Sequence, residues 1–172
     1  MGDTLTAIIA IALAAVLMFL FPLMTMSDRA DDVAQLAVET ATTEFVDNIR
    51  TTGKITPDNY GKFIEAIGST GNTYDLEIEV KVLDENPGRK ETTSYGQIGE
   101  NVYYAVYTSQ IEEKIKNQEN YNLKEGDVVT VSVKNTNKTL AQQLKNFFYT
   151  VTGNNAYTIA SSHGGTVVAT GK

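Results

Sequence analysis

The sequence contains no cysteine and no tryptophan, and His163 is its single histidine among 172 residues. The lack of cysteine excludes disulfides, thiolate metal ligands and cysteine catalysis, and one histidine is too few for an ordinary zinc site. His163 lies in the run Ser-Ser-His-Gly-Gly, which is typical of an exposed turn. A serine next to a histidine in sequence is not the spatial arrangement that nucleophilic catalysis needs. We therefore expect no catalytic residue, no metal, no cofactor and no enzymatic activity.

Positive charge is also scarce, with 14 basic against 21 acidic residues and a net charge of −7. The stretch from residue 4 to residue 27 carries no charge at all, so all 14 basic and 20 of the acidic residues follow it. An acidic domain without a basic cluster argues against nucleic acid as a partner. It also argues against docking on anionic lipid through charge alone.

Residues 5–26 form a long apolar segment, in which Thr6 and Thr25 are the only polar side chains. As a helix these 22 residues would extend about 33 Å, which is enough to cross the hydrocarbon core of a bilayer. The alternative is a cleaved secretory signal, which prefers a basic start, a shorter apolar core and a small-x-small cleavage site. Because none of these is present, we expect a retained transmembrane helix.

Orientation depends on the residues that flank this segment. Arg29 is the only nearby basic residue, and it lies among Asp28, Asp31 and Asp32, so this flank is not a basic cluster. Counting basic residues alone weakly favours a cytoplasmic C-terminal side, but the composition of the soluble part leads us to expect the C-terminal domain outside the cytoplasm. The three aspartates could hold a hard cation or meet a basic partner, although an ordinary solvated helix face is the simpler explanation.

The helical pattern continues beyond the membrane, since residues 28–50 contain no glycine or proline. Apolar residues in this stretch recur at steps of three and four and so mark one helix face: Ala34, Val38, Ala41, Phe45 and Ile49. We expect one helix from about Leu5 to Arg50, ended by Gly53. Pro22 should bend it.

The rest of the chain predicts a small α+β domain. We expect helices over 57–67, over most of 102–120 and over 139–150, and strands over 74–83 and 129–134. The segment 102–107 has strand composition, but the helical residues after it favour a helix. The expected inner side of the helix over 139–150 consists of Leu140, Leu144, Phe147, Phe148 and Val151. Two final strands, 157–160 and 166–169, should flank a hairpin turn at 161–165.

These elements predict an α+β fold in which a long transmembrane-plus-stalk helix packs on a small antiparallel sheet with two or three further helices. The expected division is a short tail at 1–4, a transmembrane helix at 5–26, an amphipathic stalk at 27–52 and an extracytoplasmic domain at 53–172. Within the membrane helix, Ala7, Ala10 and Ala14 share one face. Ala10 and Ala14 form a small-xxx-small pair that would permit close helix packing, although alanine is also common in membrane helices.

The order of these features resembles that of type IV pilins and pseudopilins: Gly2 in a short N-terminus, an uncharged helix with Pro22 near its far end, an amphipathic continuation and an α+β domain. In detail the chain is similar to TadE-like pseudopilins of Tad (tight adherence) systems. The segments that look similar to such proteins of Gram-positive anaerobes are Thr52-Gly53-Lys54-Ile55, Gly71-Asn72-Thr73-Tyr74 and Glu125-Gly126-Asp127-Val128-Val129.

The resemblance implies peptidase processing at Gly2, a place in the cell membrane, at the cell surface or in a pilus, and partners among pilin-like or secretion-machinery subunits or further copies of the chain. Prepilins usually carry basic residues before the cleavage glycine and a glutamate five residues beyond it. Here no basic residue precedes Gly2, and Ala7 stands at the glutamate position. We therefore expect a non-enzymatic structural or accessory subunit. The alternative is a membrane-anchored, extracytoplasmic ligand-binding or sensor domain.

Overall fold

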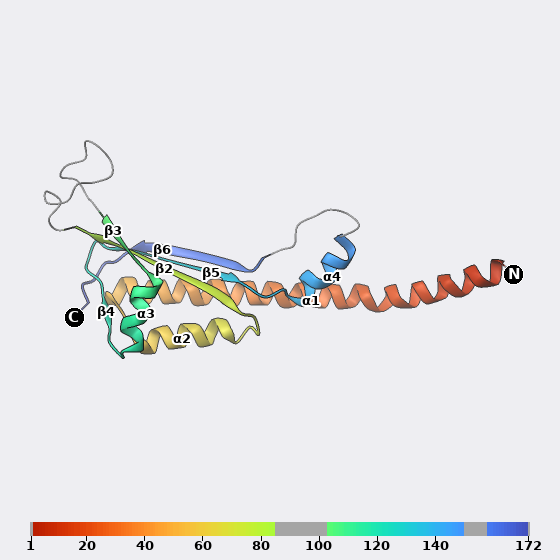
Figure 1. The fold of residues 1–172 in the computed structure, drawn as a ribbon, viewed down its shortest axis with the longest axis horizontal. Helices are drawn as coiled ribbons and strands as arrows, with labels where there is room; N and C mark the ends of the chain where they lie inside the picture. The colour runs from red at the N-terminus through yellow and green to blue at the C-terminus, as the bar shows by residue number, and fades with distance from the viewer. Residues whose placement is uncertain (1, 85–102, 150–157, 172) are drawn as a thin grey trace, which may run out of the picture.

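The computed structural model describes residues 2–84, 103–149 and 158–171, with all their side chains except those of 147–149. The first element is α1, Gly2–Thr52, which runs unbroken from the apolar segment into the domain (Figure 1). This confirms the prediction of one continuous helix. The domain half of α1 buries a single side, since its buried residues recur at helical spacing. They are Ala34, Val38, Thr42, Phe45, Val46 and Ile49. Gly53 then ends the helix with φ of 67° and donates its N–H to the Ile49 carbonyl.

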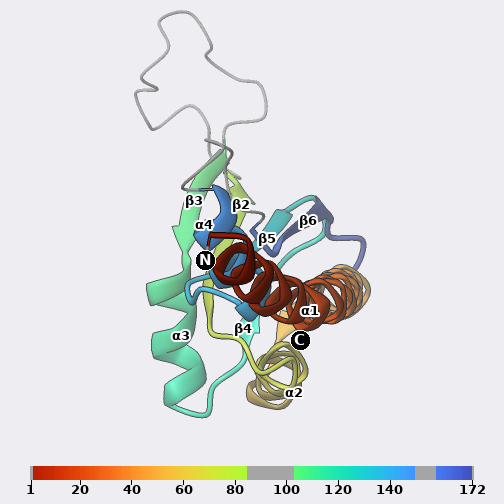
Figure 2. The same ribbon diagram turned by 90° about the vertical axis from the view of Figure 1, so that its right-hand side faces the viewer.

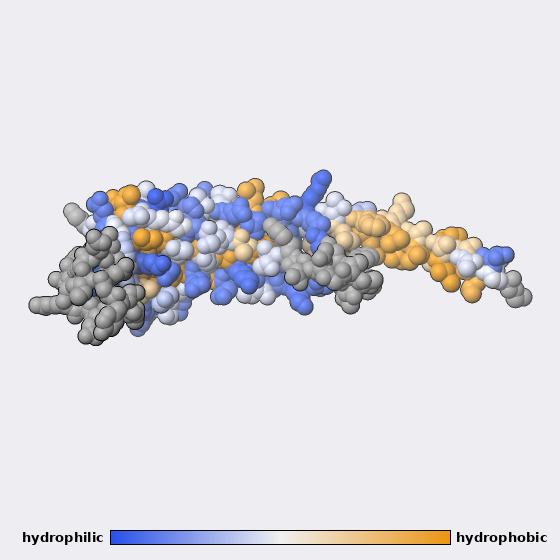
Figure 3. Space-filling model, turned by 90° about the horizontal axis from the view of Figure 1, so that it is seen from above, coloured by the Kyte–Doolittle hydropathy of each residue, from blue (hydrophilic) through white to orange (hydrophobic). Residues whose placement is uncertain are grey.

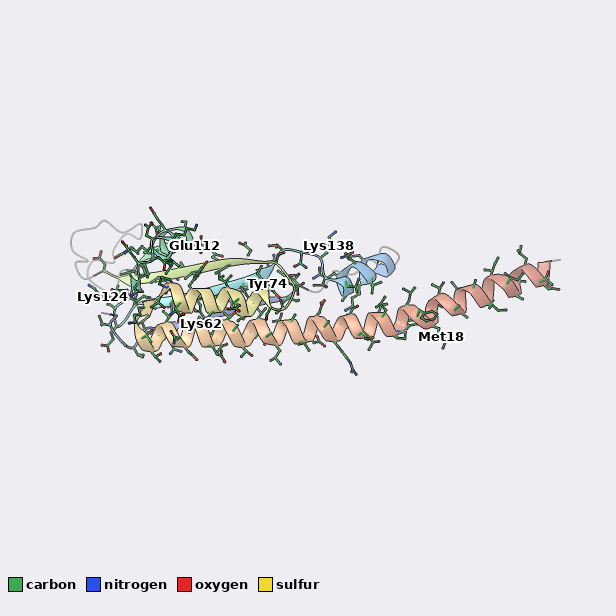
Figure 4. All side chains as sticks on the ribbon, turned by 90° about the horizontal axis from the view of Figure 1, so that it is seen from below. Met18, Lys62, Tyr74, Glu112, Lys124 and Lys138 are labelled. Carbon is green, nitrogen blue, oxygen red and sulfur yellow. The ribbon has the colours of Figure 1, made fainter. Side chains whose placement is uncertain are left out.

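Pro22 lies inside α1, where its ring nitrogen has no hydrogen to donate to the carbonyl of Met18 one turn earlier. The axis of α1 changes direction close to Met18, as Figure 4 shows. The missing hydrogen bond and the bend coincide, as expected for a proline in a helix.

The remaining elements form a four-stranded antiparallel sheet, a small two-stranded sheet and three short helices. The larger sheet has the order β3-β2-β5-β6, and the smaller one pairs β1 with β4. The strands are β1 Lys54–Ile55, β2 Tyr74–Leu83, β3 Tyr103–Tyr107, β4 Tyr121–Asn122, β5 Val128–Asn135 and β6 Ala160–Thr166. The helices are α2 Pro57–Gly68, α3 Thr108–Lys116 and α4 Leu140–Tyr149. The expected α+β class is confirmed, as are α2, α4, β2 and β5.

One face of the larger sheet is covered and the other meets solvent. Ile78, Val80, Val129 and Val131 point to the covered face, where they are fully buried. The alternate residues of β2 and β5, such as Glu77 and Lys134, point outward. Helix α1 lies between this sheet and α2, as seen both from the side and from its end (Figures 1 and 2). The stacked rings of Phe45 and Phe63, with centroids 4.4 Å apart, join α1 to α2.

The expectation of a helix over most of 102–120 is wrong at its start. Residues Tyr103–Tyr107 are strand β3, and the helix occupies only Thr108–Lys116. The strand forms because it pairs with β2 over five positions, from Leu83 opposite Tyr103 to Glu79 opposite Tyr107. Its strand composition was therefore the correct local signal. Residues 85–102, which include the first residue of this expected helix, lie outside the described residues.

The predicted hairpin turn at 161–165 is also wrong. These residues are the middle of a single strand, β6, and they pair with β5 from Val129 to Val133. The glycines that suggested a turn are needed for close packing instead. A Cβ on Gly165 would lie 2.6 Å from Arg50 Nε of α1, and one on Gly164 would lie 2.9 Å from the Val129 carbonyl oxygen. Of the expected strand 157–160, only Ala160 belongs to β6, and Tyr157 lies outside the described residues. Of the expected strand 166–169, only Thr166 belongs to β6.

The inner side of α4 differs from the prediction. Leu140 is 54% exposed, whereas Ala141 and Gln142 are buried. Leu144 is half-buried, and the side chains of Phe147 and Phe148, together with Val151, lie outside the described residues. The inward side is displaced because the start of α4 is held against α1 by polar contacts.

Candidate functional site

The apolar half of α1 projects from the domain as an uncovered helix. Its side chains are largely exposed, with Ile11 at 70%, Met18 at 76% and Phe19 at 77%. Figure 3 shows this half as an apolar rod beyond a domain whose surface is mainly hydrophilic. Within the described part of the chain, α1 is the one helix long and apolar enough to cross a membrane, and none of its most apolar stretch is buried. Length and composition are therefore compatible with a membrane anchor.

The residues predicted for helix packing all lie on this uncovered rod. Ala7, Ala10, Ala14 and Pro22 are exposed and belong to α1 at positions that the domain does not cover. Gly2, the predicted processing site, is the first helical residue, and a Cβ added there would meet no atom within 4 Å. The structure therefore leaves these positions accessible and brings them into no shared cavity.

Where the rod enters the domain, Asp31 is buried against the start of α4. Asp31 Oδ2 accepts a hydrogen bond of 2.6 Å from the hydroxyl of Thr139, and both residues are less than 10% exposed. The same hydroxyl accepts from the N–H of Gln142 at 3.2 Å, and Gln142 Oε1 accepts from the N–H of Thr139 at 3.3 Å. This reciprocal capping box begins α4, and a carboxylate at a helix N-terminus is electrostatically favourable.

A second contact joins the same two helices one turn away. Asp28 Oδ1 lies 2.6 Å from Lys145 Nζ, and a hollow of about 240 Å³ is lined by Asp28, Asp31, Asp32 and Lys145. Among the residues that the structure describes, no three acidic or histidine side chains gather as a metal site would require. Asp28 contacts the Lys145 amine and Asp31 contacts the Thr139 hydroxyl, whereas Asp32 is exposed. We call Asp28, Asp31, Thr139 and Lys145 the collar.

Helix α1 also covers the outer edge of β6. The side-chain amide of Gln35 donates to the Ala160 carbonyl at 2.7 Å and accepts from the Ala160 N–H at 3.0 Å, as a neighbouring strand would. At the other end of β6, Arg50 Nε donates to the Thr166 carbonyl at 3.0 Å. Such contacts close a sheet edge that could otherwise pair with another chain.

No protein-family model, curated protein or solved structure matches this chain.

The geometry at His163 corrects the expectation of an exposed turn histidine. His163 is on β6, and its Nε2 lies 3.9 Å from Asp47 Oδ1 of α1. Ser162 points to the opposite face of the strand, where its hydroxyl is 2.9 Å from that of Ser132. The two neighbours in sequence therefore cannot act together on one substrate.

A half-buried contact between a tyrosine and a carboxylate is also explained by packing. The hydroxyl of Tyr60 on α2 donates to Glu112 Oε1 on α3 at 2.8 Å. Burial first, and then the hydrogen bond and negative charge of Glu112, raise the pKa of Tyr60 above its usual value of 10.0. This keeps the phenol protonated and joins α2 to α3.

Sequence reasoning missed Gln35 as the stalk residue that contacts β6, and Thr139 and Lys145 as partners of the stalk aspartates. One local signal was available, because Thr139 followed three residues later by Gln142 matches a capping box. The identity of the carboxylate that Thr139 contacts has no local signal, since Asp31 lies 108 residues away.

Proposed function

We propose that this chain is a non-enzymatic, single-pass membrane protein whose domain lies outside the cytoplasm and which serves as a pilin-like structural or accessory subunit of a pilus or secretion assembly. The observation that carries the proposal is the dual use of α1. Its first half is bare and apolar, and its second half supplies the central core residues of the domain. Because the anchor and a core helix of the domain are one helix, a lateral contact made by the anchor also positions the domain.

The collar supports this reading. It fixes α4 to α1 directly after the apolar segment. Polar groups therefore gather at the level where the hydrocarbon core of a bilayer would end. The predicted arrangement, with residues 5–26 in lipid and residues 27–172 in water, places every described charged side chain except that of Asp3 on one side of the apolar segment. Charged side chains are costly within the bilayer core.

The resemblance to TadE-like pseudopilins supports the assembly role, and Ala7 at the position of the family's glutamate favours an accessory subunit. Partners in this proposal are the lipid bilayer and other pilin-like or secretion-machinery subunits, with Ala10 and Ala14 as the packing face. The chain would then act through helix packing and surface display.

The test uses single cysteines in the full chain, which has no native cysteine. Ala10→Cys and Ala14→Cys should give crosslinked homo- or hetero-oligomers in membranes. Ala15→Cys is the matched control, because Ala15 is turned about 100° round the helix from Ala14. Equal crosslinking at all three positions, or none at any, would count against the assembly role.

Membrane insertion and topology are tested separately. We expect the full chain to resist extraction by alkaline carbonate, and a cysteine at the exposed Ser109 to react with a membrane-impermeant maleimide on intact cells. N-terminal sequencing of the mature chain would show whether the bond after Gly2 is cut. A chain that washes off the membrane would contradict the anchor. A soluble fragment of residues 27–172 that binds a small ligand would favour the ligand-binding role of the alternative function.

A further inference from the structure

Helix α2 covers one side of α1 only in part. Phe63 of α2 stacks on Phe45 of α1, but α2 ends at Gly68, and Figure 4 shows this end well short of the apolar rod. Between the two, α1 borders a groove of about 640 Å³ whose other wall is formed by Ser69 and Thr70. The α1 residues that line the groove are Met26, Arg29, Ala30, Val33, Ala34 and Ala37.

The groove continues the bare apolar surface of the rod into the domain. It begins at Met26, the last residue of the apolar segment, which is 69% exposed, and it includes Val33, which is 68% exposed. Val33 lies about 10 Å beyond Met26 along the helix. Apolar side chains of membrane-bound helices can bury about 5–10 Å into the boundary between head groups and acyl chains. The groove can therefore extend the lipid contact of α1 on this side.

Arg29 is the one charged side chain that lines the groove, and its position fits a lipid phosphate. It is exposed and makes no ion pair with any residue that the structure describes. Along the helix it lies about 4.5 Å beyond Met26, within a head-group layer that is about 5–7 Å deep on each side of the hydrocarbon core. A guanidinium can bind a phosphate through two parallel hydrogen bonds while its aliphatic stem packs on apolar surface.

The opposite side of α1 is polar at the same height. The collar residues Asp28 and Asp31 make their contacts with α4 there. At 100° per residue, Asp28 is turned about 160° from Met26, and Asp31 is turned about 160° from Val33. Immersion of this side in lipid would bury carboxylates at a cost, whereas immersion of the groove side buries a methionine and a valine. The bilayer surface should therefore meet the two sides of α1 at different heights.

We propose that the Met26–Val33 side of α1 lies in the head-group layer of the bilayer, where the groove holds a phospholipid whose phosphate binds Arg29, while the collar side stays in water. The inference rests on the proposed membrane anchoring. Transmembrane helices are tilted by about 20° on average, and a tilt towards the groove lowers Val33 and raises the collar. The contact depends on the position of one arginine, so it needs no basic cluster.

The experiment measures immersion of the full chain, which has no native cysteine, in vesicles of phosphatidylcholine and phosphatidylglycerol. A nitroxide label is attached to Val33→Cys or Asp32→Cys, and its collision rates with oxygen and with a water-soluble nickel chelate are compared. Asp32 is exposed, lies about 1.5 Å nearer the apolar segment than Val33 and is turned about 100° from it. Height alone predicts deeper immersion at Asp32, whereas we expect an oxygen-to-nickel ratio at least about twofold higher at Val33.

Changing Arg29 tests the phosphate contact. Arg29→Gln in the Val33→Cys chain should lower the ratio towards the value at Asp32, and Arg29→Lys, which keeps the positive charge, should retain most of it. Because Arg29 is exposed, neither change should alter the fold, which circular dichroism checks. An unchanged ratio in Arg29→Gln would overturn the phosphate contact.

A ratio at Val33 equal to or below that at Asp32 overturns the inference. A Val33 label that neither oxygen nor nickel reaches also overturns it, because protein and not lipid would then fill the groove. A third label, at Ile11→Cys, separates these results from the proposed function. If Ile11 is in lipid while Val33 is in water, the anchor stands and this contact is lost. If Ile11 is also in water, the chain has no membrane anchor and both proposals fail.

Discussion

The hydroxyl of Thr139 donates a 2.6 Å hydrogen bond to the carboxylate of Asp31, joining the first turn of α4 to the stalk across 108 residues of chain. The contact is buried on both sides, and the same hydroxyl also begins α4 through Gln142. A single oxygen therefore decides both where α4 starts and where it docks.

Replacing Asp31 with Asn should lower the free energy of unfolding by about 1.5–3 kcal/mol, the usual range for a hydrogen bond to a charged group. Combined with Thr139→Val in a double-mutant cycle, it should show a coupling energy of about 1 kcal/mol or more. Urea unfolding of the full chain in detergent, followed by circular dichroism, measures both. Asp32→Asn is the control, because Asp32 is exposed, and a cost equal to that of Asp31→Asn would contradict the assignment.

Gly53 and Gly71 provide a matched pair for testing close packing. Both have positive φ, 67° and 77°, so alanine is strained at either position. A Cβ on Gly53 would also lie 2.2 Å from the Ala169 carbonyl oxygen, whereas one on Gly71 would meet nothing within 4 Å. Gly71→Ala should cost about 1–2 kcal/mol, and Gly53→Ala more than about 3 kcal/mol because backbone must move. Similar melting temperatures for the two variants would refute the close approach of the C-terminal segment.

The free energy of unfolding should depend on pH in the alkaline range. Burial, and then the charges of Tyr104 and Asp127, raise the pKa of Tyr121 from 10.0 to about 12. Above pH 10 the unfolded chain releases this proton and the folded chain keeps it, so unfolding becomes easier as pH rises. The stabilisation is complete below pH 10 and is lost between about pH 10 and 12.

Tyr121→Phe should therefore flatten the decline of unfolding free energy between pH 10 and 12, measured by urea unfolding at each pH. The raised pKa of Tyr60 should leave part of the decline in place. If the variant were less stable by the same amount at every pH, the tyrosine proton would not be the cause.

Truncation should separate the roles of the two halves of α1. A fragment of residues 27–172 should be soluble and folded, since it keeps the buried side chains Val38, Phe45, Val46 and Ile49. A fragment of residues 53–172 loses all of these and should fail to fold. Circular dichroism and thermal melting distinguish them. A cooperative melt from the shorter fragment would show that the stalk is not part of the core.

Sequence periodicity was sufficient for the elements whose packing is local. The steps of three and four in α1 and the alternation in β2 and β5 each depend on burying one side, and each was predicted correctly. At Tyr103–Tyr107 the sequence held two signals, and only pairing with β2 decided between them.

The Ser-Ser-His-Gly-Gly run shows a deeper limit. Small and polar residues usually mark a turn, but here they form a strand because they pair with β5, and Gly165 lies close against the Arg50 side chain of α1. That close approach belongs to tertiary structure and has no trace in the local sequence. The collar is similar, because Asp28 and Asp31 were visible in the sequence while their partners Thr139 and Lys145 could not be assigned from it.

In the proposed membrane orientation, the continuity of α1 gives the molecule a fixed height. From Met26 to Thr52 the helix rises about 39 Å, and at its end the segment 169–171 closes over Gly53 through the hydrogen bond from Gly171 to Leu123. No flexible linker intervenes, so in the proposed orientation the domain cannot swivel on its tether. If the rod tilted within the bilayer, the far end of the domain would move sideways about 40 Å above the lipid. This end consists of β1, β4 and the C-terminal segment.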